Sequence, residues 1–426
     1  MACSRYLGFD PVERPQWRNA QPNNDSIPNV STMIAQILEY KRAWLKLRKR
    51  KKERYETVQQ EMYLEFLYQI QVGEDIGILH RRTFDEIVND ESAKMTPKRG
   101  LKRQHSNSGK DNLSRYKCKK SDSINSLEDR MGKYTLSSSQ TSNNSTYDDT
   151  MNGGSLSSNE NSLPSSQDAQ IFIMNSQNDQ TKETETINLL RGYHHLKNEL
   201  QKIPKEERSG YVGLIDVETC IKSCHEILMC NLIDKMKTPA GKFSVLPRTA
   251  EFEGKQYFYP SYKTEDVAFE ALQAVVDQYN TMISEVSKID DEKEKLKNSF
   301  KCASVLLFSF LTLHPFSDGN GRLARLLCNH CLKTFCPFPT AVYNNVSPTT
   351  RSDYLRALIN CREGLNLSPY QIQFPDDSIR EALAILEQKP VELCSLIIES
   401  NWFTWRYFLR KLGINIPFIL DYEVAE

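Results

Sequence analysis

The chain has 426 residues, of which 39% are hydrophobic, so it is long enough to bury a sizeable core and to form more than one structural unit. Its 55 basic and 55 acidic side chains cancel to a formal net charge of zero. This balance argues against a whole-chain field that draws the protein onto nucleic acid or an anionic membrane, so neither is an expected partner.

The longest strongly apolar run, 303–313, is interrupted by serine and threonine and is far shorter than the roughly 20 residues that cross a membrane. No basic segment followed by an apolar one opens the chain, so we expect no signal peptide and predict a cytoplasmic protein. The eleven cysteines are an odd number without paired spacing, which favours free buried thiols over disulfides.

Three regions of different composition fill the first part of the chain. Residues 1–30 are rich in Pro, Asn and Asp and are predicted to be an irregular lead. In residues 31–89 apolar side chains recur at a helical spacing, which predicts one long helix or two, with the basic residues of 46–54 on a solvated face. Residues 90–182 are rich in Ser, Asn and Gln, so we predict a disordered insert. Its basic clusters KRGLKR and KCKK leave nuclear entry open.

Residues 183–365 return to helical periodicity and include one predicted hairpin. Two short β-prone arms in GKFSVLPRTAEFEGKQYFYPSY, residues 241–262, flank an EGK turn. Three or more helices follow. Residues 366–426 again show helical patterning and are predicted to form a C-terminal helical extension. The expected fold class is therefore mainly α with one β-hairpin.

The stretch HPFSDGNGRLARLL, residues 314–327, has the composition of a phosphate-binding turn. We predict a loop that follows a buried helix ending at Leu313 and leads into a helix starting near Gly321. Unpaired N–H groups at a helix N-terminus attract anions, and Gly319 and Gly321 allow the backbone to approach closely.

Polar side chains of the same stretch complete the predicted site. Arg322 and Arg325 are three residues apart on one helix face and can both contact phosphate oxygens, to which Asn320 adds a donor. Asp318 supplies the carboxylate that Mg²⁺ prefers together with phosphate oxygens. His314 is of the residue type that takes a proton from an incoming hydroxyl near neutral pH. Together these residue types predict attack on a nucleotide phosphate.

The stretch matches every fixed position of HPFx(D/E)GNGRxxR, and the chain resembles a Fic-domain protein. GKFS at 241–244, with its hairpin, resembles the Fic flap, and RSDYLRALINCREG at 351–364 resembles the helix that follows the nucleotide site. The family often has arginine where Ser244 stands, so no catalytic role is carried over to that position. The resemblance implies a Fic-type helical bundle with a β-hairpin flap, and a catalytic core over 183–365.

The resemblance also implies a reaction, the transfer of AMP from ATP to a Ser, Thr or Tyr hydroxyl of a protein. His314 would be the general base and Asp318 the Mg²⁺ ligand. The phosphates of ATP would be held by Gly319, Asn320, Gly321, Arg322 and Arg325. A target protein would dock along the flap, 241–262, by β-augmentation. The sequence leaves the target and the oligomeric state open, a homo-oligomer included.

Many Fic proteins carry an inhibitory helix with (S/T)xxxE(G/N), whose glutamate pairs with the second arginine of the motif. The segment QIQVGEDIGIL, which begins at Gln69, resembles this helix and places Glu74 at the glutamate position. Ile70 and Asp75 depart from the consensus. We interpret Glu74 as a carboxylate that reaches Arg325 and restrains activity, and the alternative is a plain surface carboxylate.

Other functions stay open on sequence alone. The same site could remove AMP or use another nucleotide or phosphodiester donor. The fold could also be a catalytically idle scaffold whose basic helix and insert recruit partners. The spacing C-x₂-C-x₄-C around His330 resembles a zinc site, but we interpret these cysteines as core residues of the helix that follows the motif.

Overall fold

The computed structural model gives the fold of most of the chain. It describes residues 5–20, 27–47, 52–95, 166–201, 213–232, 238–333, 335–343, 346–365, 367 and 370–414. The chain divides into two compact units, residues 1–107 with 180–426, and residues 108–179. Of the second unit only 166–179, the first part of α5 (Ser166–Gln201), is described. Most of the predicted insert, with both basic clusters, lies outside the described residues.

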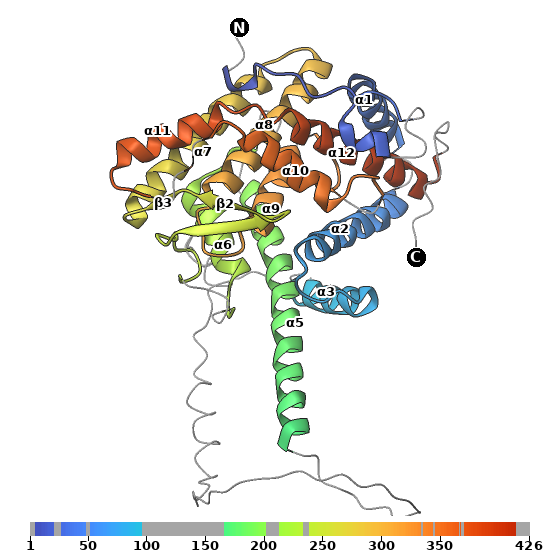
Figure 1. Ribbon diagram of the computed structural model, residues 1–426. Helices are drawn as coiled ribbons and strands as arrows, with labels where there is room; N and C mark the ends of the chain where they lie inside the picture. Colours follow the sequence, from blue (N-terminus) through green and yellow to red (C-terminus); the bar gives the residue numbers. More distant parts are fainter. Residues whose placement is uncertain are drawn as a thin grey trace, which may run out of the picture. The chain divides into compact units, whose positions relative to one another are not determined.

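The described part of the first unit is mainly α-helical, as the sequence predicts (Figure 1). α8 (Glu292–Leu313) is buried along nearly all of its last sixteen residues. Two of its serines are compatible with burial because they donate to carbonyls of their own helix, Ser299 Oγ to Lys295 O at 2.7 Å and Ser304 Oγ to Lys301 O at 2.8 Å. The helices that pack against α8 are α1 (Val30–Leu47), α7 (Glu265–Ser287), α9 (Asn320–Leu332), α11 (Pro375–Leu386) and α12 (Val391–Lys411).

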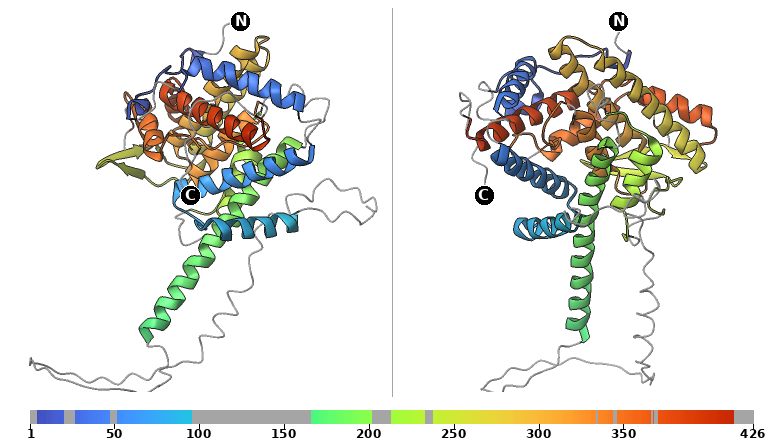
Figure 2. Two further views of the ribbon diagram at one scale, coloured as in Figure 1. Left: turned by 90° about the vertical axis from the view of Figure 1, so that its right-hand side faces the viewer. Right: turned by 180° about the vertical axis from the view of Figure 1, so that it is seen from behind.

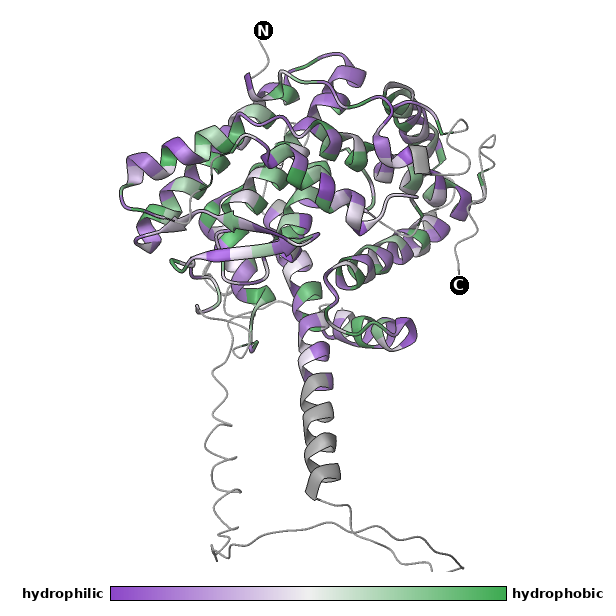
Figure 3. Ribbon diagram, in the orientation of Figure 1, coloured by the Kyte–Doolittle hydropathy of each residue, from purple (hydrophilic) through white to green (hydrophobic). Residues whose placement is uncertain are grey.

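The predicted N-terminal helical region consists of α1, α2 (Lys52–Glu74) and α3 (Arg81–Met95). α1 runs beside α12, and α2 contacts α3, α9 and α12 (Figures 1 and 2). Figure 3 shows hydrophilic and hydrophobic residues mixed along α2 and α3, as expected for helices with one packed face. α3 continues beyond residue 89 because Glu91 and Met95 extend its packed face. Helix therefore occupies both ends of the predicted insert.

The predicted hairpin is present, and it turns where the sequence indicates. β1 (Arg248–Phe252) pairs antiparallel with β2 (Lys255–Tyr259), with the first residue of β1 opposite the last residue of β2. Glu253 and Gly254 form a two-residue turn with φ angles of 50° and 75°. A turn with two positive φ angles matches the twist of the paired strands, and glycine adopts this conformation readily.

The described part of the C-terminal region packs on the same core. α11 contacts α7 and α8, and α12 contacts α1, α8 and α10 (Arg351–Arg362). Trp402 and Trp405 of α12 are fully buried. β4 (Gln371–Ile372) pairs in parallel with β3 (Ser261–Tyr262), which fixes the end of the hairpin segment to the C-terminal part of the chain.

Two expectations from composition can be compared with the structure. Eight cysteines within the described residues are free, and seven of these are buried, whereas Cys230 is disulfide-bonded and departs from the expectation of free thiols. Cys328 and Cys331 of α9 lie in the hydrophobic core. Within the ranges that the structure describes, no helix combines the length and the hydropathy that crossing a membrane requires.

A buried ion pair fastens the N-terminal segment to α12. Arg18 Nε donates to Glu399 Oε2 at 2.8 Å, and the two residues are 1% and 0% exposed. Arg18 Nη1 also donates to Pro28 O at 2.8 Å. Burial raises the pKa of the Glu399 carboxyl, and the guanidinium beside it opposes that shift.

Arg18→Met is expected to lower the free energy of unfolding by about 3–5 kcal/mol, because it leaves Glu399 buried without its partner. Urea unfolding at neutral pH measures the loss. The control is Arg42→Met, because Arg42 pairs with Glu292 at 2.9 Å on the surface, where both side chains are 62% exposed. An exposed pair contributes about 0–1 kcal/mol, so equal losses in the two variants would contradict the prediction.

Candidate functional site

The motif loop connects α8 to α9, as the sequence predicts. α8 ends at Leu313, and His314 follows in a left-handed conformation with φ of 49°. α9 begins at Asn320, with Gly319 at φ of 75° as its N-cap. Gly319 has no side chain to bond the first N–H groups of α9, so the N-cap does not compete with an anion for them.

The side chain of Asn320 closes the loop. Its Oδ1 accepts the Phe316 N–H at 3.0 Å, and its Nδ2 donates to Phe316 O at 2.8 Å. Both residues are buried. The carboxamide thus shapes the backbone of the loop, and the phosphate contact predicted for Asn320 stays a prediction.

His225 of α6 (Ser223–Leu228) holds the same loop from the other side. Its Nδ1 accepts the Gly241 N–H at 2.9 Å, which leaves Nε2 as the protonated nitrogen that donates to Asp318 O at 3.0 Å. The imidazole stacks on Phe316, with ring centres 3.7 Å apart. Ser244 N–H donates to Pro315 O at 2.9 Å, so the entry to the flap is bonded to the motif loop directly at Pro315 and through His225 at Asp318.

His314 lies under the flap. Its ring stacks on Tyr259 of β2, with centres 4.0 Å apart and planes 18° apart. Burial, with the charges of Arg248 and Arg362 nearby, lowers the pKa of His314 to about 3. The imidazole is therefore neutral at physiological pH and can accept a proton. Its Nδ1 is buried without a hydrogen-bond partner.

Asp318 presents the carboxylate of the loop. Its side chain is 39% exposed, its Oδ1 accepts the Gly319 N–H, and its Oδ2 lies 3.5 Å from Arg322 Nη2. Within the described ranges, no three His, Cys, Asp or Glu side chains cluster as a metal site. A single accessible carboxylate fits Mg²⁺, which commonly takes one or two carboxylates and completes its shell with phosphate oxygens and water.

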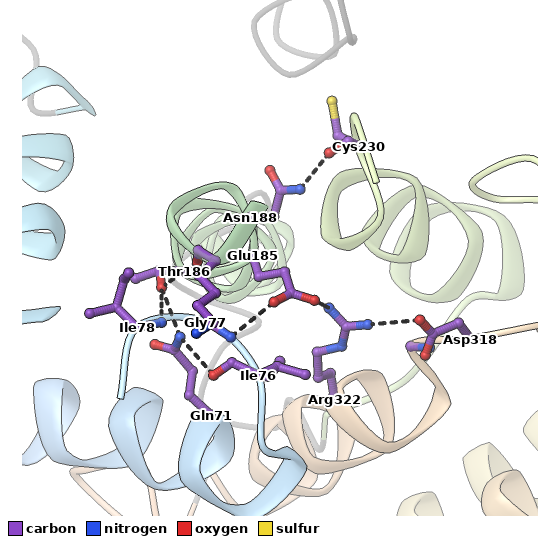
Figure 4. Close-up of polar contacts among 12 residues, drawn as sticks. Gln71, Ile76, Gly77, Ile78, Glu185, Thr186, Asn188, Cys230, Asp318 and Arg322 are labelled. Carbon is purple, nitrogen blue, oxygen red and sulfur yellow. Dashed lines mark hydrogen bonds and ion pairs between the residues drawn. The ribbon is translucent and has the colours of Figure 1, made fainter. Parts of the chain in front are cut away.

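Arg322 is buried between two carboxylates. Its Nη2 faces Asp318, and its Nη1 lies 4.0 Å from Glu185 Oε1 of α5 (Figure 4). Arg322 is 3% exposed and Glu185 1%. Nη1 of Arg322 makes no hydrogen bond of its own. A buried guanidinium with an unused donor is suited to receive an additional anionic oxygen.

Arg325 forms an ion pair with the predicted regulatory carboxylate. Its Nη2 contacts Glu74 Oε1, and its Nη1 donates to Tyr343 Oη at 2.9 Å. A Cβ on Gly321 would collide with the carboxylate of Glu74. The glycine at this position therefore makes room for the glutamate, in addition to the close phosphate approach that the sequence predicts for it.

The end of α2 places Glu74 at this position. α2 ends at Glu74, and Asp75 follows with φ of 53°. Glycine and asparagine adopt this left-handed conformation most readily and aspartate tolerates it, so the departure at Asp75 keeps the local geometry. Arg351 Nε donates to Gly73 O at 2.8 Å and holds the last turn of the helix.

The motif residues and Glu74 thus meet around the N-terminal turn of α9, although the sequence separates them by more than two hundred positions. Among the residues that contact them, four were not singled out from the sequence, namely His225, Glu185, Tyr259 and Tyr343. The local sequence offered one indication of a role for His225, namely that this histidine lies within an apolar helical run. Nothing in the local sequence marked Glu185.

Comparisons with known proteins agree with the resemblance. Residues 217–332 match the model of the Fic/DOC family. This range includes His225, the flap, the motif loop and the whole of α9. The match supports a Fic domain in this part of the chain.

Two curated proteins are similar over part of their length. The chain is 39% identical over 64 residues to a Fido domain-containing protein of Dictyostelium discoideum, which is 15% of this chain and 45% of that protein. It is 29% identical over 163 residues to the ribonucleoside-diphosphate reductase small chain of Ostreid herpesvirus 1 (isolate France), which is 38% of this chain and 25% of that protein. The chain spans less than half the length of both relatives.

Two solved structures resemble the fold distantly. A Fic domain-containing signaling protein from Bacteroides thetaiotaomicron aligns with a TM-score of 0.45 and 16% identity over 91% of this chain and 100% of that chain. A single-residue variant of Fic-1 from C. elegans aligns with a TM-score of 0.42 and 14% identity over 90% of this chain and 71% of that chain.

His225→Phe is expected to make the protein less sensitive to acid. Burial lowers the pKa of His225 to about 4, whereas an unfolded histidine has a pKa near 6.5. Between these values the unfolded chain binds a proton that the folded chain does not, so stability falls as the pH falls. Without this group, the fall in the free energy of unfolding from about pH 7 to about pH 4.5 should shrink by about 2–3 kcal/mol.

Urea unfolding of the wild type and the variant at the two pH values measures this difference. Phenylalanine retains an aromatic ring against Phe316. The matched control is His80→Phe, which makes the same substitution at an exposed histidine. If the free energy of unfolding of His225→Phe fell with pH as steeply as that of the wild type, the prediction would be wrong. His225 would then bind its proton equally well in the folded and the unfolded chain.

Proposed function

We propose that the protein is an adenylyltransferase that transfers AMP from Mg-ATP to a Ser, Thr or Tyr hydroxyl of a target protein. The observation that carries this proposal is the meeting of a neutral histidine, an accessible carboxylate and two buried arginines at one helix N-terminus. The match of residues 217–332 to the Fic/DOC family supports it. A site of this composition can bind a polyphosphate and accept a proton beside it.

Each residue has a separate task in this proposal. The N–H groups at the start of α9 bind phosphate oxygens, and Arg322 and Arg325 contact them from the same helix. The target hydroxyl attacks the α-phosphorus, and its proton passes to the neutral ring of His314. A bond forms between the target oxygen and the α-phosphorus as the bond to the pyrophosphate oxygen breaks. Asp318 would hold Mg²⁺, which supplies positive charge next to the phosphates.

The same proposal assigns Glu74 a regulatory role. Glu74 occupies Nη2 of Arg325, a donor that the phosphates of ATP need. A carboxylate and a phosphate cannot both occupy this donor, so bound nucleotide and the Glu74 contact compete. Glu74 is therefore a restraint on productive ATP binding, and the protein in the described conformation is in its restrained state.

Removal of Glu74 should raise AMP transfer. Purified wild type, Glu74→Ala and His314→Ala are incubated with Mg-ATP, and intact-mass spectrometry detects covalently added AMP. Glu74→Ala should carry about tenfold more AMP than the wild type, because a charge-assisted contact contributes about 1.5–3 kcal/mol. His314→Ala should lose the activity by at least about a hundredfold, because it lacks the base.

Glu61→Ala is the control for the carboxylate. Glu61 lies on the same helix and pairs with Lys411 at 3.3 Å in an exposed position, so its loss should change nothing. Equal modification of Glu74→Ala and the wild type would refute the restraint. Equal modification of His314→Ala and Glu74→Ala would refute the assignment of the base. No added AMP on any variant, with Mg-ATP binding shown separately, would refute AMP transfer itself.

A further inference from the structure

Two side chains of α5 hold the turn that follows α2 (Figure 4). Glu185 Oε2 accepts the Gly77 N–H at 2.9 Å, and Thr186 Oγ1 accepts the Ile78 N–H at 3.1 Å. Thr186 Oγ1 also accepts from Gln71 Nε2 at 2.8 Å. Glu185, Thr186 and Gln71 are each at most 1% exposed. We call Glu185 and Thr186 the α5 clasp.

The clasp accepts hydrogen bonds from two backbone N–H groups that have no acceptor within α2. The N–H groups of Gly77 and Ile78 lie beyond the end of the helix, and a backbone donor shielded from water needs a partner. Gly77 has φ of 64°, and a Cβ at this position would collide with the carboxamide of Gln71. The turn is therefore closed tightly against the clasp, and Glu74 lies three residues before its first clasped N–H group.

A second link joins α5 to the helix on the other side of the turn. Arg191 of α5 donates to Glu91 Oε1 of α3 from Nε at 3.0 Å and from Nη2 at 2.6 Å. Both the turn and α3 are thus bonded to α5. The segment that carries Glu74 is therefore bonded to α5 on its C-terminal side.

Glu185 extends this connection to the motif. Its Oε2 binds the turn, and its Oε1 faces Arg322 at 4.0 Å. Glu74 contacts Arg325 one helical turn further along α9. Figure 4 shows Glu185 between the turn and Arg322. Glu185 is thus bonded to the turn that begins directly after Glu74, the partner of the second motif arginine.

We propose that the α5 clasp sets the strength of the Glu74 restraint, so that Glu74 leaves Arg325 when α5 releases the turn. This inference rests on the restraint assigned to Glu74 under the proposed function. Because Glu185 also faces Arg322, release of the turn changes the surroundings of both phosphate-binding arginines together. A change in α5 would then strengthen or weaken the contact between Glu74 and Arg325.

Thr186→Val tests the clasp, since it removes the hydroxyl at nearly constant size and does not substitute either arginine or its carboxylate partners. Hydrogen exchange of the Gly77 and Ile78 amides is measured without nucleotide, and the affinity for Mg-ATP is measured by calorimetry on the full chain. We expect exchange to accelerate and affinity to rise, each by about tenfold, because a lost buried hydrogen bond is worth about 1–3 kcal/mol.

Two matched variants control for the substitution itself. Thr184→Val makes the same change two residues earlier on α5, where the hydroxyl bonds only to its own helix at Gln180 O, 2.8 Å away. Thr186→Ser restores the clasp oxygen. Both should behave as the wild type. If Thr186→Val does not fold, Gln71→Met replaces it, because it removes the other donor to Thr186 and should shift both readouts in the same direction by a smaller factor.

The double variant Glu74→Ala with Thr186→Val separates the clasp from other effects. If the clasp acts through Glu74, the double variant binds Mg-ATP no more tightly than Glu74→Ala alone. The proposal would be overturned if the two substitutions raised the affinity for Mg-ATP independently, so that their factors multiplied in the double variant. It would also be overturned if Thr186→Val and Thr184→Val gave the same amide exchange and the same affinity. Because exchange and binding need no transfer of AMP, a clasp effect without any added AMP would refute the proposed reaction and leave the clasp standing.

Discussion

The rest of the site depends on two buried guanidinium groups, which need negative charge beside them. Arg322 and Arg325, on the first turns of α9, are 3% and 4% exposed, and a buried charge requires a nearby opposite charge. In the described state the opposite charges are carboxylates of the chain itself, from α2, α5 and the motif loop. A bound nucleotide would supply negative charge of the same kind. The arginines that would bind phosphate therefore also bind α2 and α5 through Glu74 and Glu185.

This requirement explains why the site extends beyond the matched region. Residues 217–332 contain the motif loop, the flap and α9, yet Glu74 and Glu185 lie outside that range. Without these two carboxylates, Arg322 would keep one partner at 3.5 Å, and Arg325 would keep a neutral phenol. The helices on the N-terminal side therefore complete the electrostatics of the domain and are more than a cover for its apolar surface.

How far the sequence predicted the site depends on how local each interaction is. The loop that begins at His314 is encoded by neighbouring residues, so its boundaries were predicted to within one residue and the turn at Glu253 and Gly254 was predicted correctly. Glu74 could be found because the segment around it resembles a known pattern. Glu185 could not, because it sits in an ordinary amphipathic helix and acquires its role only when folding brings it to the end of α2, over a hundred residues away in sequence. The helical ends of the predicted insert, up to Met95 and from Ser166, were not predicted from its composition.

The position of the flap affects His314, the base of the proposed reaction. Tyr259 covers one face of the His314 ring, and the nearby guanidinium groups of Arg248 and Arg362 add to the effect of burial on its pKa. A histidine in this setting is neutral but only weakly basic, because protonation would add a third positive charge beside two guanidinium groups, with little water to solvate it. Water or a target hydroxyl that reached the other face or the edge of the His314 ring would lower this cost. The pKa of His314 would then rise towards its ordinary value. In the proposed reaction, docking of a target along the hairpin would therefore change the basicity of His314 as well as supply the hydroxyl that it deprotonates.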